Sequence, residues 1–351
     1  EQVREQMAAV ESAVGRRFGD PEDPLLVSVR SGAPVSMPGM MDTILNLGLN
    51  EATTVGLARI SGKPEFAAAC RDRFVGGYRD IVGVEDVPAD PWEQLRGAIE
   101  AVFRSWNSPR AKAYRAHEGI SDDLGTGVIV QTMVFGNLGP DSGTGVVFTR
   151  NPATGEAALY GDVLFDAQGE DVVAGTHDTE AITVLDERMP GIARQLREYA
   201  ARLEHHYADV CDIEFTIERG RRRMLQTRIG KRSPEAAQRI AVEMAEDGGF
   251  PLDRRAAVER VARYLADPPR RAAELQAGAD EIATGLPASP GIAAGEIATS
   301  PDTAVTMADA GKQVVLVRRE TSPDDVHGMA RAAAILTSTG GLASHAAVVA
   351  R

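Results

Sequence analysis

Cysteine and long apolar runs are what this sequence has least of. Its 351 residues include 2 cysteines, Cys70 and Cys211, which are too few for a disulfide framework and are not spaced as metal ligands. No apolar run approaches the roughly 18 residues that a membrane-spanning helix needs, and no basic region followed by an apolar stretch marks the N-terminus. We therefore expect a cytoplasmic protein that does not bind a membrane.

Positive charge is also scarce, because 38 Lys and Arg face 51 Asp and Glu, for a net charge of -13. Such a charge repels nucleic acid and anionic surfaces at long range, so any phosphate ligand must be held by local positive groups and backbone amides. We expect no nucleic-acid partner. The 43% hydrophobic and 25% charged content is that of an ordinary globular protein, and the length predicts two or three domains.

The N-terminal third begins with helical periodicity, since Val3, Met7, Val10 and Val14 recur at helical spacing. Because the sequence opens inside a helix, we expect it to be part of a longer chain. Residues 25–29 (LLVSV) predict a buried strand that feeds a Gly- and Pro-rich loop at 30–39, and residues 40–117 read as mostly helical.

The middle of the chain predicts a mostly antiparallel sheet followed by helices. Strand-like segments lie at 127–135, 145–149, 213–217 and 224–227, with a turn at 219–222, and helical periodicity covers 192–207 and 234–266. Residues 267–291 are rich in Pro, Ala and Gly, which predicts a hinge. From residue 295 onward short strands alternate with helices, which is typical of a β/α domain.

A strand-to-helix junction, AILTSTGGLASHAAVVAR, closes the sequence. Gly340 and Gly341 form the turn, Ser344 is placed to cap the next helix, and His345 falls in its first turn. A helix N-terminus disfavours an imidazolium and favours a phosphate dianion, by about 0.3–1 kcal/mol. By itself this pattern equally fits a surface histidine near a helix cap.

That junction resembles the phosphohistidine swivelling domain of the phosphoenolpyruvate-utilising enzymes, in which a histidine at this position is phosphorylated. VRSGAPVSMPGMMDTILNLGLN at 29–50, QTMVFGNLGPDSGTGVVFTRNPATGE at 131–156 and AQGEDVVAG at 167–175 are similar to the pyruvate, phosphate dikinase branch of that family. Together the matching stretches span nearly the whole chain.

The resemblance implies an α+β and α/β multidomain fold. An ATP-grasp nucleotide-binding domain would occupy residues 1–232, incomplete at its N-terminus, with a helical subdomain at about 50–118. A helical segment and hinge would follow at 233–290, and a β/α phosphohistidine swivelling domain, truncated at its C-terminus, at 291–351. In such a domain the nucleotide lies between two sheets, and arginines and Mg²⁺ on oxygen ligands offset its charge.

A candidate metal site lies in CDIEFTIERGRRRMLQTRIGKR, which reads as two strands joined by a turn at Gly220. Asp212 and Glu214 are two residues apart, so they face the same side of their strand. Gln226 on the partner strand adds a neutral oxygen, and an oxygen-only set suits Mg²⁺. Two acids on an exposed strand face are the alternative interpretation.

The resemblance also assigns roles to single residues. It implies that His345 carries the phosphoryl group and that Arg228, two residues after Gln226, contacts the transferring phosphate. It places Arg30, which follows the LLVSV strand, on the triphosphate, where a salt-bridged surface arginine is the alternative. Further nucleotide contacts are implied for Glu170, Arg150, Gln131 and Met133, the last two through backbone groups that bind adenine; Lys231 and Arg232 are weaker candidates.

The implied activity converts ATP, phosphate and pyruvate to AMP, diphosphate and phosphoenolpyruvate through the phosphohistidine. The pyruvate-binding barrel is missing from this sequence, so we expect it to carry only the ATP and phosphate half-reaction, with pyruvate and phosphoenolpyruvate bound elsewhere in a full-length homodimer. A rifamycin phosphotransferase or phosphoenolpyruvate synthase relative stays an alternative, as does a non-catalytic nucleotide-sensing or phosphocarrier module.

Overall fold

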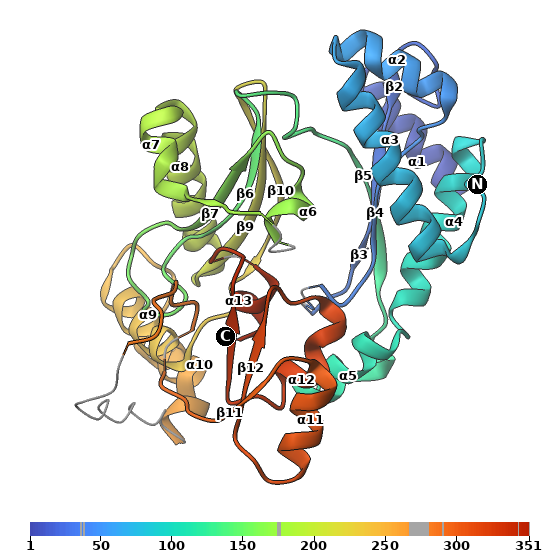
Figure 1. Ribbon diagram of the computed structural model, residues 1–351. Helices are drawn as coiled ribbons and strands as arrows, with labels where there is room; N and C mark the ends of the chain where they lie inside the picture. The colour runs from blue at the N-terminus through green and yellow to red at the C-terminus, as the bar shows by residue number, and fades with distance from the viewer. Residues whose placement is uncertain are drawn as a thin grey trace. The chain divides into compact units, whose positions relative to one another are not determined.

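The computed structural model describes residues 1–351 except 36, 38, 174–176, 267–280, 290, 343 and 351, and it does not describe the side chains of residues 170 and 173. The chain forms two compact units, Glu1–Val134 and Phe135–Arg351. Each unit has its own sheets and its own helices (Figure 1).

The first unit is built on a three-stranded antiparallel sheet in the order β4-β3-β5. Its strands are β3 (Val27–Gly32), β4 (Thr43–Leu47) and β5 (Gly127–Thr132), and a short parallel pair is formed by β1 (Arg17–Phe18) and β2 (Pro24–Leu25). The helices are α1 (Gln2–Val14), α2 (Glu51–Ser61), α3 (Pro64–Tyr78), α4 (Pro91–Ser105) and α5 (Pro109–Glu118), with short helical turns at Arg79–Gly83 and Asp122–Leu124. Helix α3 packs against β4, and helix α4 packs against both β3 and β4.

The prediction that the chain is mostly helical from Met40 onward was wrong at Thr43–Leu47, which is strand β4. Ile44 and Leu47 are fully buried, and the strand pairs antiparallel with β3. A run of five residues is too short for its periodicity to separate strand from helix. Pairing with a strand earlier in the chain decided the conformation.

The second unit contains a five-stranded antiparallel sheet in the order β10-β9-β6-β7-β8, which confirms the predicted antiparallel region for 145–149, 213–217 and 224–227. The predicted strand at 127–135 is β5, which pairs with β3 in the sheet of the first unit instead. Its strands are β6 (Gly143–Phe148), β7 (Tyr160–Phe165), β8 (Glu180–Ala181), β9 (Cys211–Glu218) and β10 (Arg221–Ile229). The helices beside it are α6 (Gly169–Val173), α7 (Leu185–Arg188) and α8 (Pro190–Tyr207), with a helical turn at Ile182–Val184. Strand β7 was not anticipated from the sequence.

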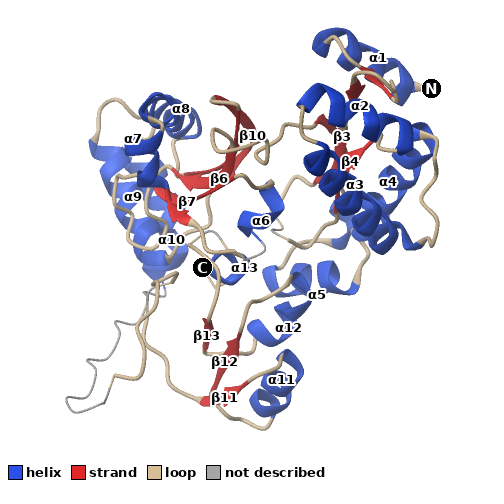
Figure 2. Cartoon of the chain, turned by 45° about the horizontal axis from the view of Figure 1, so that its top comes forward, coloured by secondary structure: helices blue, strands red, loops and turns tan. Residues whose placement is uncertain are grey.

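Strand β9 has one apolar and one polar face. Cys211, Ile213, Phe215 and Ile217 are each 0% exposed and pack in one cluster with residues of α8. Because successive side chains of a strand point to opposite faces, Asp212 and Glu214 lie on the other face. Helices α7 and α8 therefore cover one side of the sheet (Figure 2).

The predicted helical stretch 234–266 is two helices, α9 (Pro234–Glu246) and α10 (Arg254–Ala266). They pack on each other through Ile240, Met244 and Val261. Gly248, Gly249 and Pro251 lie between them, and this combination of residues ends a helix. Most of the predicted hinge, 267–280 and 290, lies outside the described residues.

The C-terminal part has the predicted alternation of strands and helices. Strands β11 (Glu296–Ala298), β12 (Val314–Arg318) and β13 (Ala334–Thr337) form a parallel sheet, with α11 (Pro301–Asp309), α12 (Val326–Met329), α13 (His345–Val349) and a turn of 3-10 helix at Pro323–Asp325. The expected helix from Pro323 to Ala332 is shorter than predicted. Helix α11 and strand β11 were not anticipated.

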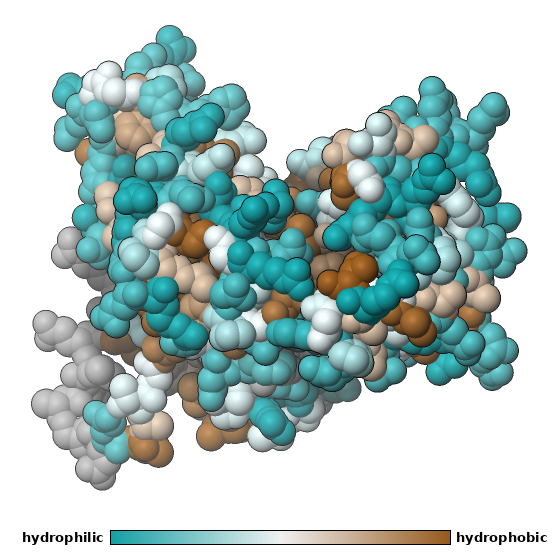
Figure 3. All heavy atoms as spheres, turned by 90° about the horizontal axis from the view of Figure 1, so that it is seen from above, coloured by the Kyte–Doolittle hydropathy of each residue, from teal (hydrophilic) through white to brown (hydrophobic). Residues whose placement is uncertain are grey.

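The surface seen in Figure 3 is predominantly hydrophilic, in keeping with the 25% charged residues. Within the described ranges, none of the helices has the length and apolar character needed to cross a membrane.

Two helical glycines of the first unit make a matched test of packing. A Cβ on Gly56 in α2 would lie 2.2 Å from the carbonyl oxygen of Pro21, whereas a Cβ on Gly76 in α3 would meet nothing within 4 Å. We expect Gly56→Ala to lower the free energy of unfolding by about 2 kcal/mol through overpacking, and Gly76→Ala to raise it by about 0.5–1 kcal/mol. Urea denaturation of both variants measures this, and effects of the same sign would contradict it.

Candidate functional site

Four polar side chains lie together on the face of the five-stranded sheet that α7 and α8 do not cover. We call this the open face. In the register of β9 and β10, Gln226 lies opposite Glu214 and Arg228 lies opposite Asp212. Directly opposed residues in an antiparallel pair point to the same face. The structure therefore brings together the three predicted metal ligands and the predicted phosphate-binding arginine.

Arg228 is ion-paired with both carboxylates of this set. Its Nε lies 3.1 Å from Asp212 Oδ2 and its Nη2 lies 2.6 Å from Glu214 Oε1. The three side chains are largely shielded from water, so the guanidinium compensates two carboxylates that would otherwise repel each other. The group carries a net charge of about -1, which suits a cation.

Sequence reasoning missed Asp162, a third acid on this face. Asp162 on β7 is opposite Val146 on β6, which is itself opposite Glu214, so all three lie in one row across the sheet. Asp162 is 3% exposed. The available signal was a carboxylate in the middle of the apolar run YGDVLF, since a buried acid in a strand interior requires a partner or a ligand.

The oxygen chemistry of this face fits Mg²⁺, which prefers carboxylate and amide oxygens. Asp212 and Glu214 supply two carboxylates, and Gln226 supplies an amide oxygen from the facing strand. Among the described residues, no group of three or more His, Cys, Asp and Glu side chains is arranged to hold a metal. The set proposed from the sequence differs because one of its ligands is an amide.

Three other predicted residues belong to the first unit. Arg30 on β3 donates from Nη1 to Gln131 Oε1 on β5 at 3.3 Å, and Ser28 pairs with Gln131 in the strand register. The backbone amide of Met133 donates to the carbonyl of Leu26 at 2.8 Å. The structure thus brings Arg30 and Gln131 together on neighbouring strands, and their nucleotide contacts stay predictions.

Arg150 lies in a buried ion-pair network in the second unit. Its Nε donates to Glu204 of α8 and its Nη1 donates to Glu243 of α9, both at 2.6 Å, and the arginine is 6% exposed. Burial raises the pKa of Glu204, against the effect of Arg150, while the exposed Arg239 lowers the pKa of Glu243. These contacts give Arg150 a structural role in joining α8 and α9, and its nucleotide contact stays a prediction.

The remaining weaker candidates have separate surroundings. Arg232 is paired with Asp209 at 2.7 Å, next to the start of β9. Glu170 lies in α6, and its side chain is outside the described residues. Helix α6 packs on the open face through Val172, which contacts Val146.

His345 is the first residue of α13 and is 8% exposed. Ser344 occupies the N-cap position as predicted, without a side-chain capping hydrogen bond, and Gly340 makes the turn with φ +103°. The Nδ1 of His345 is 3.0 Å from Thr321 Oγ1, and its buried Nε2 is hydrogen-bonded by no residue in the described part of the chain. Burial lowers the pKa of His345, and the nearby Asp325 opposes this, so the ring is held neutral.

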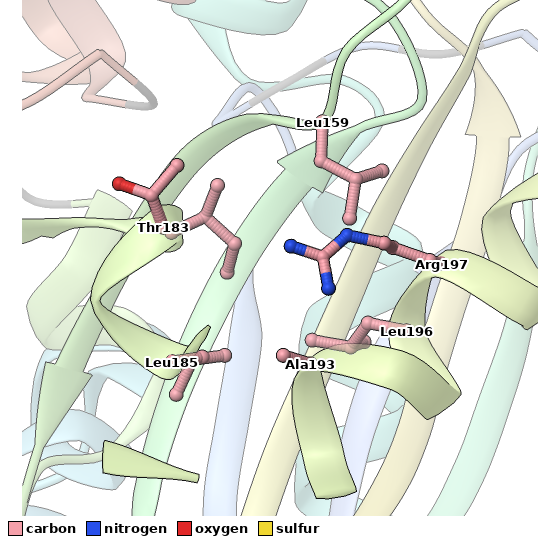
Figure 4. A pocket seen from close by; sticks show the side chains of 7 residues that line it. Leu159, Thr183, Leu185, Ala193, Leu196 and Arg197 are labelled. Atoms are coloured by element: carbon pink, nitrogen blue, oxygen red, sulfur yellow. The ribbon is translucent and has the colours of Figure 1, made fainter. Parts of the chain in front are cut away.

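A small cavity lies on the covered side of the same sheet, under α8 (Figure 4). It is lined by Leu159, Ile182, Thr183, Leu185, Ala193, Leu196 and Arg197, and the Arg197 guanidinium points among the leucines. Its volume of about 20 Å³ has room for about one water molecule. It is far too small for a nucleotide.

The C-terminal segment is similar to a known domain. Residues 310–351, which contain His345, match the family model of the mobile domain of the phosphoenolpyruvate-utilising enzymes. These residues are thus similar to that mobile domain, and the chain as a whole is a mixed helix-and-sheet, multidomain protein.

The rest of the chain specifies the branch. Residues 1–196 and 184–248 match the AMP/ATP-binding domain of pyruvate phosphate dikinase, and the chain belongs to the pyruvate, phosphate dikinase family. It is 45% identical to the pyruvate, phosphate dikinases of Clostridium symbiosum and Rhizobium meliloti, with 100% of this chain and 46% and 45% of those proteins covered. A chloroplastic enzyme of Flaveria pringlei is 44% identical, with 100% of this chain and 42% of the enzyme covered. The chain thus spans less than half the length of these relatives.

The Arg150 network predicts a stability effect that an exposed pair does not share. Arg150→Met leaves the buried Glu204 without its cation, so we expect a loss of about 3 kcal/mol in the free energy of unfolding. Arg239, which is exposed and also pairs with Glu243, is the matched control, and Arg239→Met should be close to wild type. Equilibrium denaturation and ATP titration are the measurements; an Arg150→Met protein of wild-type stability with weakened ATP binding would reverse the structural assignment.

The lowered pKa of His345 predicts how stability depends on pH. The unfolded chain binds a proton near the ordinary value of 6.5, whereas the folded protein binds it only at lower pH. Between these two values the unfolded state holds more protons, so wild type loses stability relative to His345→Gln as pH falls below about 6.5, by at most about 1.4 kcal/mol per pH unit. Above about pH 7 the difference should be constant. A difference that stays flat down to pH 5 would show that burial does not disfavour the imidazolium.

Proposed function

We propose that this chain carries the ATP and phosphate half-reaction of a pyruvate, phosphate dikinase, with His345 as the phosphoryl acceptor. The complete reaction converts ATP, phosphate and pyruvate to AMP, diphosphate and phosphoenolpyruvate. The observation that supports it best is the state of His345: a buried, neutral imidazole has one ring nitrogen held by Thr321 and the other hydrogen-bonded by no described residue. A neutral ring with an available lone pair is what a nucleophilic histidine requires.

Nucleotide binding is proposed for an ATP-grasp domain that includes the open face of the five-stranded sheet. Asp212, Glu214 and Gln226 would hold Mg²⁺, which supplies positive charge against the phosphate oxygens. Arg228 lies opposite Asp212 on the same face, and its guanidinium is a planar fork of donors that matches phosphate oxygens. The contacts predicted for Arg30, Glu170, Arg150, Gln131 and Met133 belong to the same proposal.

The assignment of functions to the domains of the complete protein is also part of the proposal. The nucleotide-binding domain covers 1–232, with a helical subdomain at about 50–118, the connecting segment covers 233–290, and the phosphohistidine swivelling domain begins at 291. Pyruvate and phosphoenolpyruvate would bind to a further domain of the complete protein, which we propose to be a cytoplasmic homodimer. The relatives named pyruvate, phosphate dikinase support the proposal that pyruvate is the final acceptor of the phosphoryl group.

Transfer of a labelled phosphoryl group tests the proposal. The complete natural protein is incubated with Mg²⁺, phosphate and ATP labelled separately at the β and γ positions, and the modified residue is mapped by mass spectrometry. We expect β-derived label on His345 with release of AMP and diphosphate. His345→Ala should take no label, and His327→Ala should label normally, because His327 is exposed and bonded to Asp302.

Each other outcome has a distinct meaning. Label from the γ position on another residue would indicate an ordinary kinase reaction on this fold. ATP binding without label would indicate a nucleotide-sensing module. β-derived label on His345 that passes to an acceptor other than pyruvate would indicate a phosphoenolpyruvate synthase or a rifamycin phosphotransferase.

A further inference from the structure

The segment that enters β4 is held by side chains of two helices. Strands β3 and β4 are neighbours in the sheet of the first unit (Figure 1), and the sequence between them, at 33–42, is rich in Gly, Pro and Met. Such a sequence has no alternation of apolar and polar residues that would fix where the next strand begins. The contacts of its last residues, Met40 and Asp42, therefore matter for the start of β4.

Arg110, in the first turn of α5, binds both of these residues. Its Nε donates to the carbonyl oxygen of Met40 at 3.3 Å, and its Nη2 donates to the carboxylate of Asp42. The side chains of Arg110 and Asp42 are 24% and 21% exposed, so the ion pair is mostly shielded from water. The backbone amide of Asp42 donates to Ser105 Oγ, at the end of α4, at 3.2 Å. Asp42 is thus held through its side chain by α5 and through its backbone by α4.

The corner between α4 and α5 is itself well fixed. Arg115 is 1% exposed, its guanidinium lies 4.1 Å from the ring centroid of Trp106, and its Nη1 donates to the carbonyl of Trp106 at 2.6 Å. The indole of Trp106 donates to the carbonyl of Asp122 at 3.1 Å. Ser105, next to Trp106, is 4% exposed. Arg110 therefore extends from a rigid part of the first unit.

The residue after Asp42 is the strand partner of Arg30. Thr43 is the first residue of β4 and lies directly opposite Arg30, and the register of β3 with β4 ends at this pair. Ile44 is 1% exposed and faces the helices, as Asp42 does through its contacts. Because side chains alternate along a strand, Thr43 lies on the other face, together with Arg30. Holding Asp42 on the helix side thus keeps Thr43 opposite Arg30.

We propose that Arg110 is a positioning residue, whose ion pair with Asp42 fixes the strand beside Arg30 and so the direction in which Arg30 meets the triphosphate of ATP. This rests on the proposed function, in which Arg30 binds the triphosphate. Arg110 acts through the strand and not by touching the nucleotide, because its donors are directed to Met40 and Asp42. A side chain that is fixed before binding loses less conformational freedom when its ligand arrives, which strengthens binding.

Nucleotide affinity of the complete natural protein tests the proposal. Arg110→Met removes the cation, and Asp42→Asn removes the opposite charge with little change of shape. We expect each variant to bind MgATP about 5- to 10-fold more weakly, as for one lost hydrogen bond, and to bind adenosine, which has no phosphate, within about twofold of wild type. Arg96→Met is the matched control and should bind both as wild type does, because Arg96 pairs with Glu100 on the exposed side of α4. Titration calorimetry measures all of these affinities.

A double variant shows whether Arg110 acts through Arg30. Once Arg30→Ala has removed the contact, adding Arg110→Met should weaken MgATP binding by less than about twofold more, since effects that share one contact do not add. A general loss of packing would instead weaken MgATP and adenosine together and would add to the effect of Arg30→Ala. Either result would overturn the positioning role, as would MgATP binding that Arg30→Ala leaves unchanged.

Hydrogen exchange examines the strand without any nucleotide. We expect the backbone amides of residues 40–47 to exchange about 5-fold faster in Arg110→Met and in Asp42→Asn than in wild type or Arg96→Met, because the start of β4 opens more often. Unchanged exchange in both variants would overturn the proposal. The two variants remove opposite partners of one ion pair, so the test survives if one of them does not fold.

The two proposals fail separately. None of these measurements requires transfer of a phosphoryl group. A protein that shows the expected affinities and exchange rates but takes no label on His345 would count against the proposed function and not against the role of Arg110.

Discussion

Burial of one face of the five-stranded sheet under α8 is the constraint on which the candidate site depends. Cys211, Ile213, Phe215 and Ile217 have no exposure because they pack in a single cluster with that helix. Fixing these side chains inward fixes the intervening residues outward, since a strand slipped by one residue would exchange its faces. Asp212 and Glu214 are thus held on the open face by apolar burial on the other side.

Charge compensation by arginine is the second theme of the structure. A chain of net charge -13 must place its cations where acids would otherwise repel, and the planar guanidinium can pair with two carboxylates at once. Arg228 does this for the acids of the open face, and Arg150 does it for Glu204 and Glu243 between α8 and α9. The ion pairs of Arg228 are partly accessible to solvent, whereas Arg150 is buried. Arg228 is therefore suited to exchange a carboxylate for a ligand, and Arg150 is suited to hold α8 and α9 together.

In the C-terminal β/α part, residues are brought together by the parallel direction of neighbouring strands and not by the alternation of side chains along one strand. Parallel strands deliver successive loops to one edge, so His345 at the start of α13 is surrounded by residues that follow the neighbouring strand. Burial at this edge keeps the imidazole neutral, and the Thr321 hydroxyl gives its two nitrogens different surroundings. A surface histidine at a helix cap would have neither property.

By itself the sequence determined whatever depends on local period and spacing. The two-residue separation of Asp212 and Glu214, the turn at Gly220 and the helix start at His345 follow from neighbours in the chain. The register shift between Met224 and Gln226 does not, because regular pairing from the turn would place Gln226 opposite Ile213 and not opposite Glu214. Tertiary structure alone decided the rest: strand β4, Asp162 in the row of Glu214, the partners of Arg150, and the contact of Thr321 with His345. Each of these joins segments that are distant in sequence, and no local pattern encodes which distant groups will satisfy a buried strand edge, charge or ring nitrogen.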